Sequence, residues 1–144
     1  EQNLAGSRIE LKRVLNGDWS TPSAEKAVRA WLRLGTSAGV SLDVIASQND
    51  SMALGARKAF QELRPEWASL PMTGCDGLPE GGQRMVATGQ LAATIIKPTT
   101  TGPAVELLAR VLLKGQPAPP ELVLHAQSYP SLDKVRPAAA QARP

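Results

Sequence analysis

The fold is decided by residues 42–63, which read LDVIASQNDSMALGARKAFQEL. The first six residues form a mostly apolar run that predicts a β-strand over 42–47. A few residues later the apolar positions change to helical spacing and place Met52, Ala56 and Phe60 on one stripe. A helix over 51–63 therefore follows the strand almost directly, which is typical of the strand–helix units of α/β proteins.

The same alternation continues on both sides of this unit. Further strands are predicted over 9–15, 70–75, 92–96 and 122–126, and helices over 22–35, 79–89 and 101–115. Repeated strand–helix–strand connections are right-handed and give parallel strands. The predicted fold class is therefore α/β, with a doubly wound parallel sheet.

Composition removes several function classes. The 144 residues are 42% hydrophobic and 20% charged, with a formal net charge of +3, which suits one domain with its own core. A single Cys and a single His exclude a disulfide framework, a multi-thiolate zinc site and a poly-histidine metal site. The basic residues are scattered and only five aromatic residues occur, so we expect no nucleic-acid binding by this segment. Because the sequence begins at Glu1 and not at Met, we expect a processed or cut product.

Polar residues follow two of the predicted strands at the edge where α/β sheets bind ligands, outside the carboxyl ends of the strands. Asn49 and Asp50 come after the strand over 42–47. Capping of the next helix explains one of these two side chains, and spacing does not decide which. The interpretation that favours a site gives the cap to Asp50 and leaves Asn49 facing the crevice. Asp76 follows the strand over 70–75, where it is either a turn residue or a carboxylate that accepts hydroxyl hydrogen bonds from a polyol.

Two further residues are candidates at the same edge. Trp19 belongs to no apolar stripe, and an indole face beside a crevice suits the C–H face of a sugar ring. Lys97 directly follows the strand over 92–96. His125 has no catalytic motif around it, and Cys75 lies in an apolar run as a small hydrophobic residue. No glycine-rich nucleotide motif occurs, so no cofactor and no metal are predicted.

At these residues the chain resembles a known family. The strings VIASQNDSMALGARKAFQEL, MTGCDGLPEGGQRMVATGQLAATIIKP and GPAVELLARVLLKG are similar to the second half of type I periplasmic sugar-binding proteins, the ribose-, galactose- and xylose-type solute receptors of ABC importers. The resemblance runs from about Val14 to about Leu124. The lactose-repressor family shares the flavodoxin-like lobe and the Asn-Asp-x-Met-Ala pattern, but it has a Pro-Leu-Thr-Thr string where this chain has Leu91-Ala92-Ala93-Thr94.

The resemblance implies a ligand site at the positions that match the family's motifs. Its sugar-binding asparagine and aspartate fall on Asn49 and Asp76, and its stacking aromatic falls on Trp19. Lys97 stands where the family often has glutamine, and Cys75 where it often has phenylalanine. An ammonium at this place favours a carboxylate or phosphate on the ligand, or a sugar whose hydroxyls accept from it.

The resemblance also implies a division of the chain between two lobes. Residues 1–97 correspond to the ligand-binding second lobe, residues 98–124 to a helix and strand that pack on the first lobe in the family, and residues 125–144 to a return crossing and flexible tail. The apolar face of the helix over 101–115, formed by Ala104, Leu108, Val111 and Leu112, then needs a partner. Another chain supplies the first lobe, or the helix packs on a neighbour, or the chain is a fragment.

The resulting function hypothesis is a solute-binding component of an ABC importer. It holds a sugar or sugar-like ligand in the cleft between two lobes, interacts with permease subunits in a periplasmic or other extracytoplasmic compartment, and performs no catalysis. The alternative is the effector-binding domain of a lactose-repressor-type regulator or of a membrane sensor with the same fold. A small flavodoxin-like enzyme is a third class, which the single His and the missing phosphate loop disfavour.

Overall fold

The computed structural model describes residues 6–134, and the terminal PAAAQARP segment expected to be a flexible tail lies outside them. The elements are α1 (Thr21–Leu32), η2 (Gly35–Ser37), β1 (Ile45–Ala46), α2 (Asp50–Leu63), α3 (Pro65–Ala68), β2 (Met72–Asp76), η3 (Pro79–Gln83), α4 (Arg84–Ala87), β3 (Ala93–Ile96), α5 (Thr101–Lys114), β4 (Gln127–Tyr129) and η4 (Leu132–Lys134).

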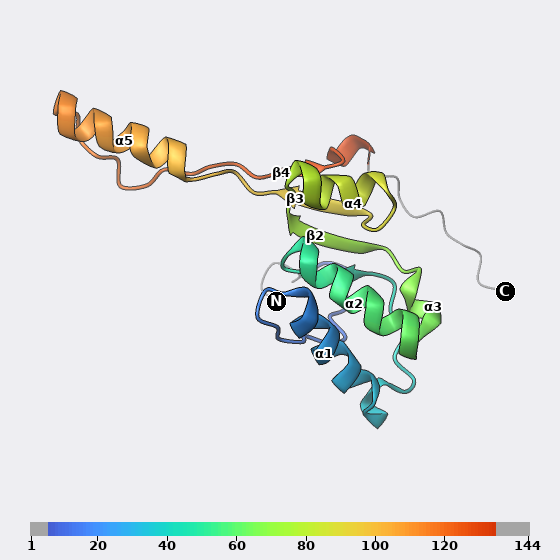
Figure 1. Cartoon of the computed structure of the whole chain (residues 1–144). Helices are drawn as coiled ribbons and strands as arrows, with labels where there is room; N and C mark the ends of the chain where they lie inside the picture. Colours follow the sequence, from blue (N-terminus) through green and yellow to red (C-terminus); the bar gives the residue numbers. More distant parts are fainter. Residues whose placement is uncertain (1–5, 135–144) are drawn as a thin grey trace.

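The sheet has four strands in the order β1-β2-β3-β4. The pairs β1–β2 and β2–β3 are parallel, whereas β4 runs antiparallel to β3. Helices flank this mainly parallel sheet (Figure 1), which confirms the predicted α/β class. The antiparallel β4 corrects the expectation of an entirely parallel sheet.

Two predicted strands are wrong. Residues 9–15 form no strand, and Ile9 and Val14 are 62% and 61% exposed. The alternating pattern there is real, but a strand also needs a neighbouring chain to pair with, and the sheet described here has none for this segment. Residues 122–126 are likewise outside the sheet, and the last strand begins at Gln127, where the chain comes alongside β3.

The predicted helix over 79–89 is shorter and less regular than expected. It consists of a π-helical turn, η3, followed by the four residues of α4. Gly81 has a non-helical backbone, with φ −111° and ψ −110°, which interrupts the regular hydrogen-bonding pattern. The other predicted helices have approximately the observed bounds.

The core lies between α2 and the face of the sheet that carries Met72 and Thr94, which are 0% and 1% exposed. Phe60 of α2 and Trp67 of α3 meet edge to face with ring centroids 5.7 Å apart, and Trp31 of α1 stacks on Trp67 at 5.6 Å. The helices α1 and α2 pack side by side (Figure 1). This cluster packs the carboxyl-terminal half of α2 against α1 and α3, at the end of the helix opposite to Asn49.

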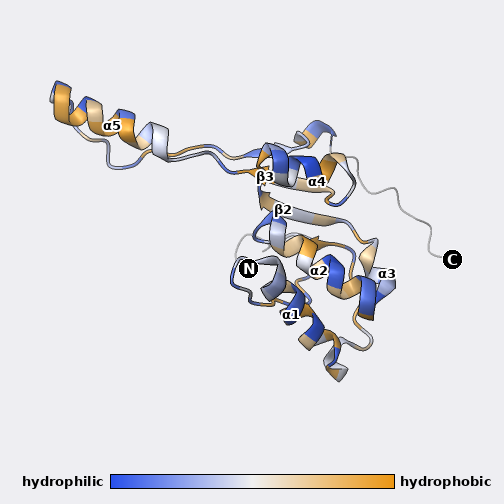
Figure 2. Cartoon of the chain, in the orientation of Figure 1, coloured by the Kyte–Doolittle hydropathy of each residue, from blue (hydrophilic) through white to orange (hydrophobic). Residues whose placement is uncertain are grey.

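The helix α5 projects away from the sheet on an extended arm (Figure 1). Much of the helix is coloured as hydrophobic in Figure 2, and none of its residues is buried. Leu108, Leu112 and Leu113 are 56%, 75% and 83% exposed. Only the segment that returns toward β4 runs beside the helix (Figure 1). Most of the apolar face of α5 therefore has no partner among residues 6–134.

Candidate functional site

The parallel strands bring three of the predicted site residues to one edge of the sheet. Asn49 follows β1, Asp76 ends β2, and Lys97 follows β3. The strands are neighbours in the order β1-β2-β3, and Asp76 is paired in register with Ile96, the residue before Lys97. Since the carboxyl ends of parallel strands meet at the same edge, this is the place where such sheets bind ligands.

Asp76 and Lys97 form an ion pair at this edge. Lys97 Nζ lies 3.0 Å from Asp76 Oδ1, and the two side chains are 68% and 38% exposed. The hydrogen bond to Asp76, followed by the Coulomb attraction of its carboxylate, raises the pKa of Lys97 above its ordinary value of 10.5. Lys97 is therefore a cation whose charge is offset by Asp76, and both groups remain accessible.

The backbone of Asp76 has φ +102°, a conformation that residues other than glycine rarely adopt. Outliers of this kind cost free energy and persist only where the surrounding structure enforces them. They are concentrated at binding and catalytic sites. The conformation of Asp76 is thus a second feature, besides its place in the sheet, that distinguishes it at this edge.

Asn49, and not Asp50, caps α2. The Asn49 Oδ1 atom accepts from the backbone N–H of Met52 at 2.7 Å, and its Nδ2 donates to the carbonyl of Trp19 at 2.9 Å. The interpretation that gave the cap to Asp50 is therefore wrong. Asn49 is 7% exposed and keeps one side-chain N–H and one lone pair beyond these two bonds.

Trp19 lies next to Asn49 through this hydrogen bond and presents its side chain to solvent. The residue is 65% exposed and has φ +66°, which is unusual for a bulky side chain. The adjacent Asp18 accepts from Ser20 Oγ at 2.6 Å, and its backbone N–H donates to Ser23 Oγ at 3.0 Å. The hydrogen bond from Ser20, then that from Ser23, lowers the pKa of the Asp18 carboxyl. The loop that carries the exposed indole is thereby held at both sides.

Asp50 is a functional candidate that the sequence reasoning assigned to the wrong role. Its carboxylate is buried and accepts from the backbone N–H of Gly77 at 3.0 Å and from Thr94 Oγ1 at 2.6 Å. Asp50 follows Asn49 and Gly77 follows Asp76, so the hydrogen bond between Asp50 and Gly77 connects the two segments that carry these candidate site residues. No local signal reveals this, because the two partners lie 27 and 44 residues further along the chain.

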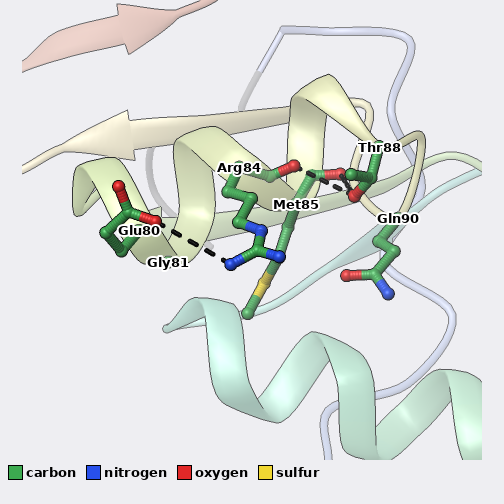
Figure 3. Close-up of a pocket in the computed structure, with 6 residues that line it drawn as sticks. All are labelled: Glu80, Gly81, Arg84, Met85, Thr88 and Gln90. Carbon is green, nitrogen blue, oxygen red and sulfur yellow. Dashed lines mark hydrogen bonds and ion pairs between the residues drawn. The ribbon is translucent and has the colours of Figure 1, made fainter.

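A hollow of about 320 Å³ lies elsewhere, against η3 and α4. Its lining consists of Glu80, Gly81, Arg84, Met85, Thr88 and Gln90 (Figure 3). The only charged groups on this lining are Glu80 and Arg84, which face each other at 3.8 Å. None of the four predicted site residues lines this hollow.

Among residues 6–134, no three His, Cys, Asp or Glu side chains gather closely enough to hold a metal ion. None of the described helices has the length and apolar character needed to cross a membrane. The sheet edge instead carries a set of hydrogen-bonding groups, one of which, Asn49, is bonded to the backbone of the exposed Trp19. A mainly parallel sheet with such an edge defines an α/β ligand-binding lobe.

Comparison with known proteins identifies the family. No family model matches the chain. The chain is 35% identical over 119 residues to the D-galactose/methyl-galactoside binding periplasmic protein of Haemophilus influenzae, which covers 82% of this chain and 34% of that protein. It is 30% identical over 100 residues to the xylitol-binding protein of Mycolicibacterium smegmatis, covering 69% of this chain and 27% of the relative.

The fold agrees with these sequence matches. The structure superimposes on the fructose-binding periplasmic domain of a hybrid two-component system with a TM-score of 0.65 and 27% identity, over 81% of this chain and 37% of that one. The chain therefore belongs to the periplasmic sugar-binding protein family. It spans about a third or less of the length of the curated relatives described here. Both relatives are named as binding proteins.

Proposed function

We propose that this chain forms one wall of the sugar-binding cleft of an ABC importer's solute-binding protein. The observation that carries the proposal is the gathering of Asn49, Asp76 and Lys97 at the carboxyl edge of three adjacent strands, with the Trp19 loop bonded to Asn49. These residues supply the acceptor, donor and apolar face that a polyol ring needs. The family of the chain makes a sugar the natural ligand.

Each residue has a distinct role in this proposal. The Asp76 carboxylate accepts hydrogen bonds from sugar hydroxyls, which are strengthened by its charge. Lys97 donates to ring or hydroxyl oxygens, and the spare N–H of Asn49 donates to a hydroxyl beside the α2 cap. The indole of Trp19 covers the C–H face of the ring.

The ion pair favours a neutral ligand. Lys97 Nζ lies 3.0 Å from Asp76, so the charge of the ammonium is already offset by the protein. An anionic ligand would have to approach the Asp76 carboxylate without a free cation to balance it. We therefore propose a neutral sugar or sugar alcohol, and not a sugar acid or sugar phosphate.

The rest of the cleft belongs, in this proposal, to the first lobe of the family, supplied by another part of the protein or by another chain. Residues 1–97 belong to the ligand-binding second lobe, and residues 98–124 carry α5, whose unpartnered apolar face packs on the first lobe. The return crossing then brings β4 back to the second lobe, beside β3. Ligand bridging the lobes shifts the equilibrium between open and closed forms, which permease subunits sense in the periplasmic space.

A sensor domain of the same fold is the second candidate. Its support is the similarity to the fructose-binding periplasmic domain of a hybrid two-component system, with 27% identity. Both candidates bind a sugar at the same edge and differ in what reads the closed form. Coexpression with ABC permease subunits, followed by sugar-dependent pull-down, separates them, because only the receptor associates with a permease.

Ligand-observed NMR tests the binding function directly. Saturation transfer is measured from the protein to D-galactose, D-fructose, xylitol and D-galacturonate. With one wall of the cleft, we expect at least one neutral compound to bind with Kd in the millimolar range, about −4 kcal/mol or weaker, and D-galacturonate to bind no better. Asp76→Ala removes a charge-assisted partner worth roughly 1.5–3 kcal/mol and is expected to abolish the signal.

Lys114→Gln serves as the control, because this exposed residue at the end of α5 carries the same charge as Lys97 outside the proposed site. Lys97→Gln should weaken the neutral sugar while Lys114→Gln leaves it unchanged. If none of the neutral compounds binds, or if Asp76→Ala binds as well as the unsubstituted chain, the proposal is wrong.

A further inference from the structure

The buried carboxylate of Asp50 stands out because no charged side chain in the described part of the chain is paired with it. Asp50 is 5% exposed, and none of the ion pairs formed among residues 6–134 includes it. A buried charge is costly unless hydrogen bonds replace the water it loses. As the first residue of α2, Asp50 also lies at the positive end of the helix dipole, where acidic side chains stabilise a helix.

Both oxygens of Asp50 are bound by groups from other elements. Oδ2 accepts from the backbone N–H of Gly77, and Oδ1 accepts from the hydroxyl of Thr94, which is 1% exposed. Gly77 directly follows β2, and Thr94 lies within β3 opposite Gly74. One carboxylate therefore connects the start of α2 with two neighbouring strands.

The surroundings are shaped around this group. A Cβ atom built on Gly74 would overlap Asp50 Oδ1, and a Cβ atom built on Gly82 would overlap Oδ2. Gly74 lies in β2, and Gly82 lies in η3. Two elements thus carry glycine at the points where the Asp50 carboxylate approaches them closely. The carboxylate therefore has little room to move.

The residues that adjoin or bond to Asp50 are next to the proposed sugar contacts or are one of them. Asn49, a proposed contact, precedes Asp50 in the chain, and Gly77, which bonds to Asp50, follows Asp76. Asp76 is held at φ +102°, and the N–H of the next peptide unit is the one that donates to Asp50. Such a conformation persists only where neighbouring contacts enforce it, and this hydrogen bond is a contact at the required place.

We propose that Asp50 is the positioning residue of the sugar site, and that its carboxylate sets the orientation of Asp76 relative to Asn49. The proposal rests on the proposed function, since it concerns the same edge of the sheet. Asp50 itself does not contact the sugar. It acts through the Gly77 peptide on one side and through the adjoining Asn49 cap on the other.

The test compares three substitutions of different severity in titrations with D-galactose, D-fructose and xylitol, followed by ¹⁵N amide shifts. Asp50→Ala removes both hydrogen bonds and is expected to weaken binding at least tenfold while shifting the Gly77 amide signal. Asp50→Asn keeps an acceptor for Gly77 and a group that can donate to Thr94 Oγ1, so binding should remain within about threefold of the unsubstituted chain. Phe60→Leu disturbs the core away from the site and should lower stability without changing affinity.

The outcomes separate this proposal from the function on which it rests. Absence of binding by the unsubstituted chain overturns the function. If Asp76→Ala loses sugar binding while folded Asp50→Ala binds as well as the unsubstituted chain, only the positioning role is overturned. Equal losses in Asp50→Ala and Phe60→Leu would show general destabilisation and also overturn it. If Asp50→Ala does not fold, Thr94→Val decides: it removes one hydrogen bond, and a folded variant with unchanged affinity contradicts the proposal.

Discussion

Replacing Asp76 by glycine should raise stability relative to alanine at the same position. Asp76 has φ +102°, where any residue with a Cβ atom is strained and glycine is not. The strain of such a conformation is about 1–3 kcal/mol. Glycine loses about 0.4–1 kcal/mol of this advantage, because its unfolded chain has more conformational freedom.

The comparison between the two variants isolates the backbone. Both lose the exposed ion pair with Lys97, so its contribution cancels. We expect the free energy of unfolding of Asp76→Gly to exceed that of Asp76→Ala by about 1 kcal/mol. For a chain of this size this is a difference of about 4 °C in Tm. Urea unfolding and thermal melting followed by circular dichroism measure both quantities.

A matched control lies two residues further on. Leu78 is 63% exposed and has φ −64°, an ordinary backbone conformation. There the order should reverse, with Leu78→Ala more stable than Leu78→Gly by about 0.4–1 kcal/mol. If Asp76→Ala is as stable as Asp76→Gly, the strain at Asp76 does not exist and one of the arguments for its functional role is lost. Sugar binding should be lost in both Asp76 variants, whatever their stability.

Three further outcomes are expected. Gly55→Ala should lower the free energy of unfolding by about 2 kcal/mol in urea titrations, because the added Cβ would collide with the backbone of Thr21 where α1 crosses α2; unchanged stability would contradict this packing. Leu112→Ser on the exposed face of α5 should change stability by less than about 0.5 kcal/mol in urea titrations, whereas a large loss of stability would show that this face is buried. The hydrogen-bonded ion pair with Arg29 lowers the pKa of Glu62 below its ordinary value of 4.5, so the stability that the pair contributes is present above pH 4.5 and is lost as the pH falls through the lower pKa of the folded state. Glu62→Gln should remove this part of the pH dependence of the free energy of unfolding, and an identical pH dependence in the variant would refute the prediction.

The sequence predicted elements well where local pattern is sufficient. The helix expected over 51–63 is α2 at Asp50–Leu63, and the strand expected over 92–96 is β3 at Ala93–Ile96. In α2 the apolar period agrees with the burial that the fold provides, whereas β3 follows from its run of β-branched residues, with Thr94 buried and Ile95 exposed. The segment 9–15 has an equally clear period but no strand beside it, so the pattern alone was misleading.

The candidate site was predictable to the level of the sheet edge, because residues that directly follow parallel strands lie at the same edge of the sheet. The partners of individual side chains were not predictable. Asn49 and Asp50 are adjacent and chemically similar, and which of them caps the helix depends on Gly77 and Thr94, which only the folded sheet brings close. Likewise, the contact between Lys97 and Asp76 follows from strand register and not from sequence spacing.

The most direct test of the account is a map of amide ¹⁵N and Trp19 indole shifts on addition of D-galactose, D-fructose or xylitol at tens of millimolar. We expect the largest changes at Asp76, Gly77 and Lys97 and at the Trp19 indole, with little change in the hollow between Glu80 and Gln90. Changes confined to that hollow or to α5, or no changes with any of the three compounds, would contradict the claim that this edge of the sheet binds a neutral sugar.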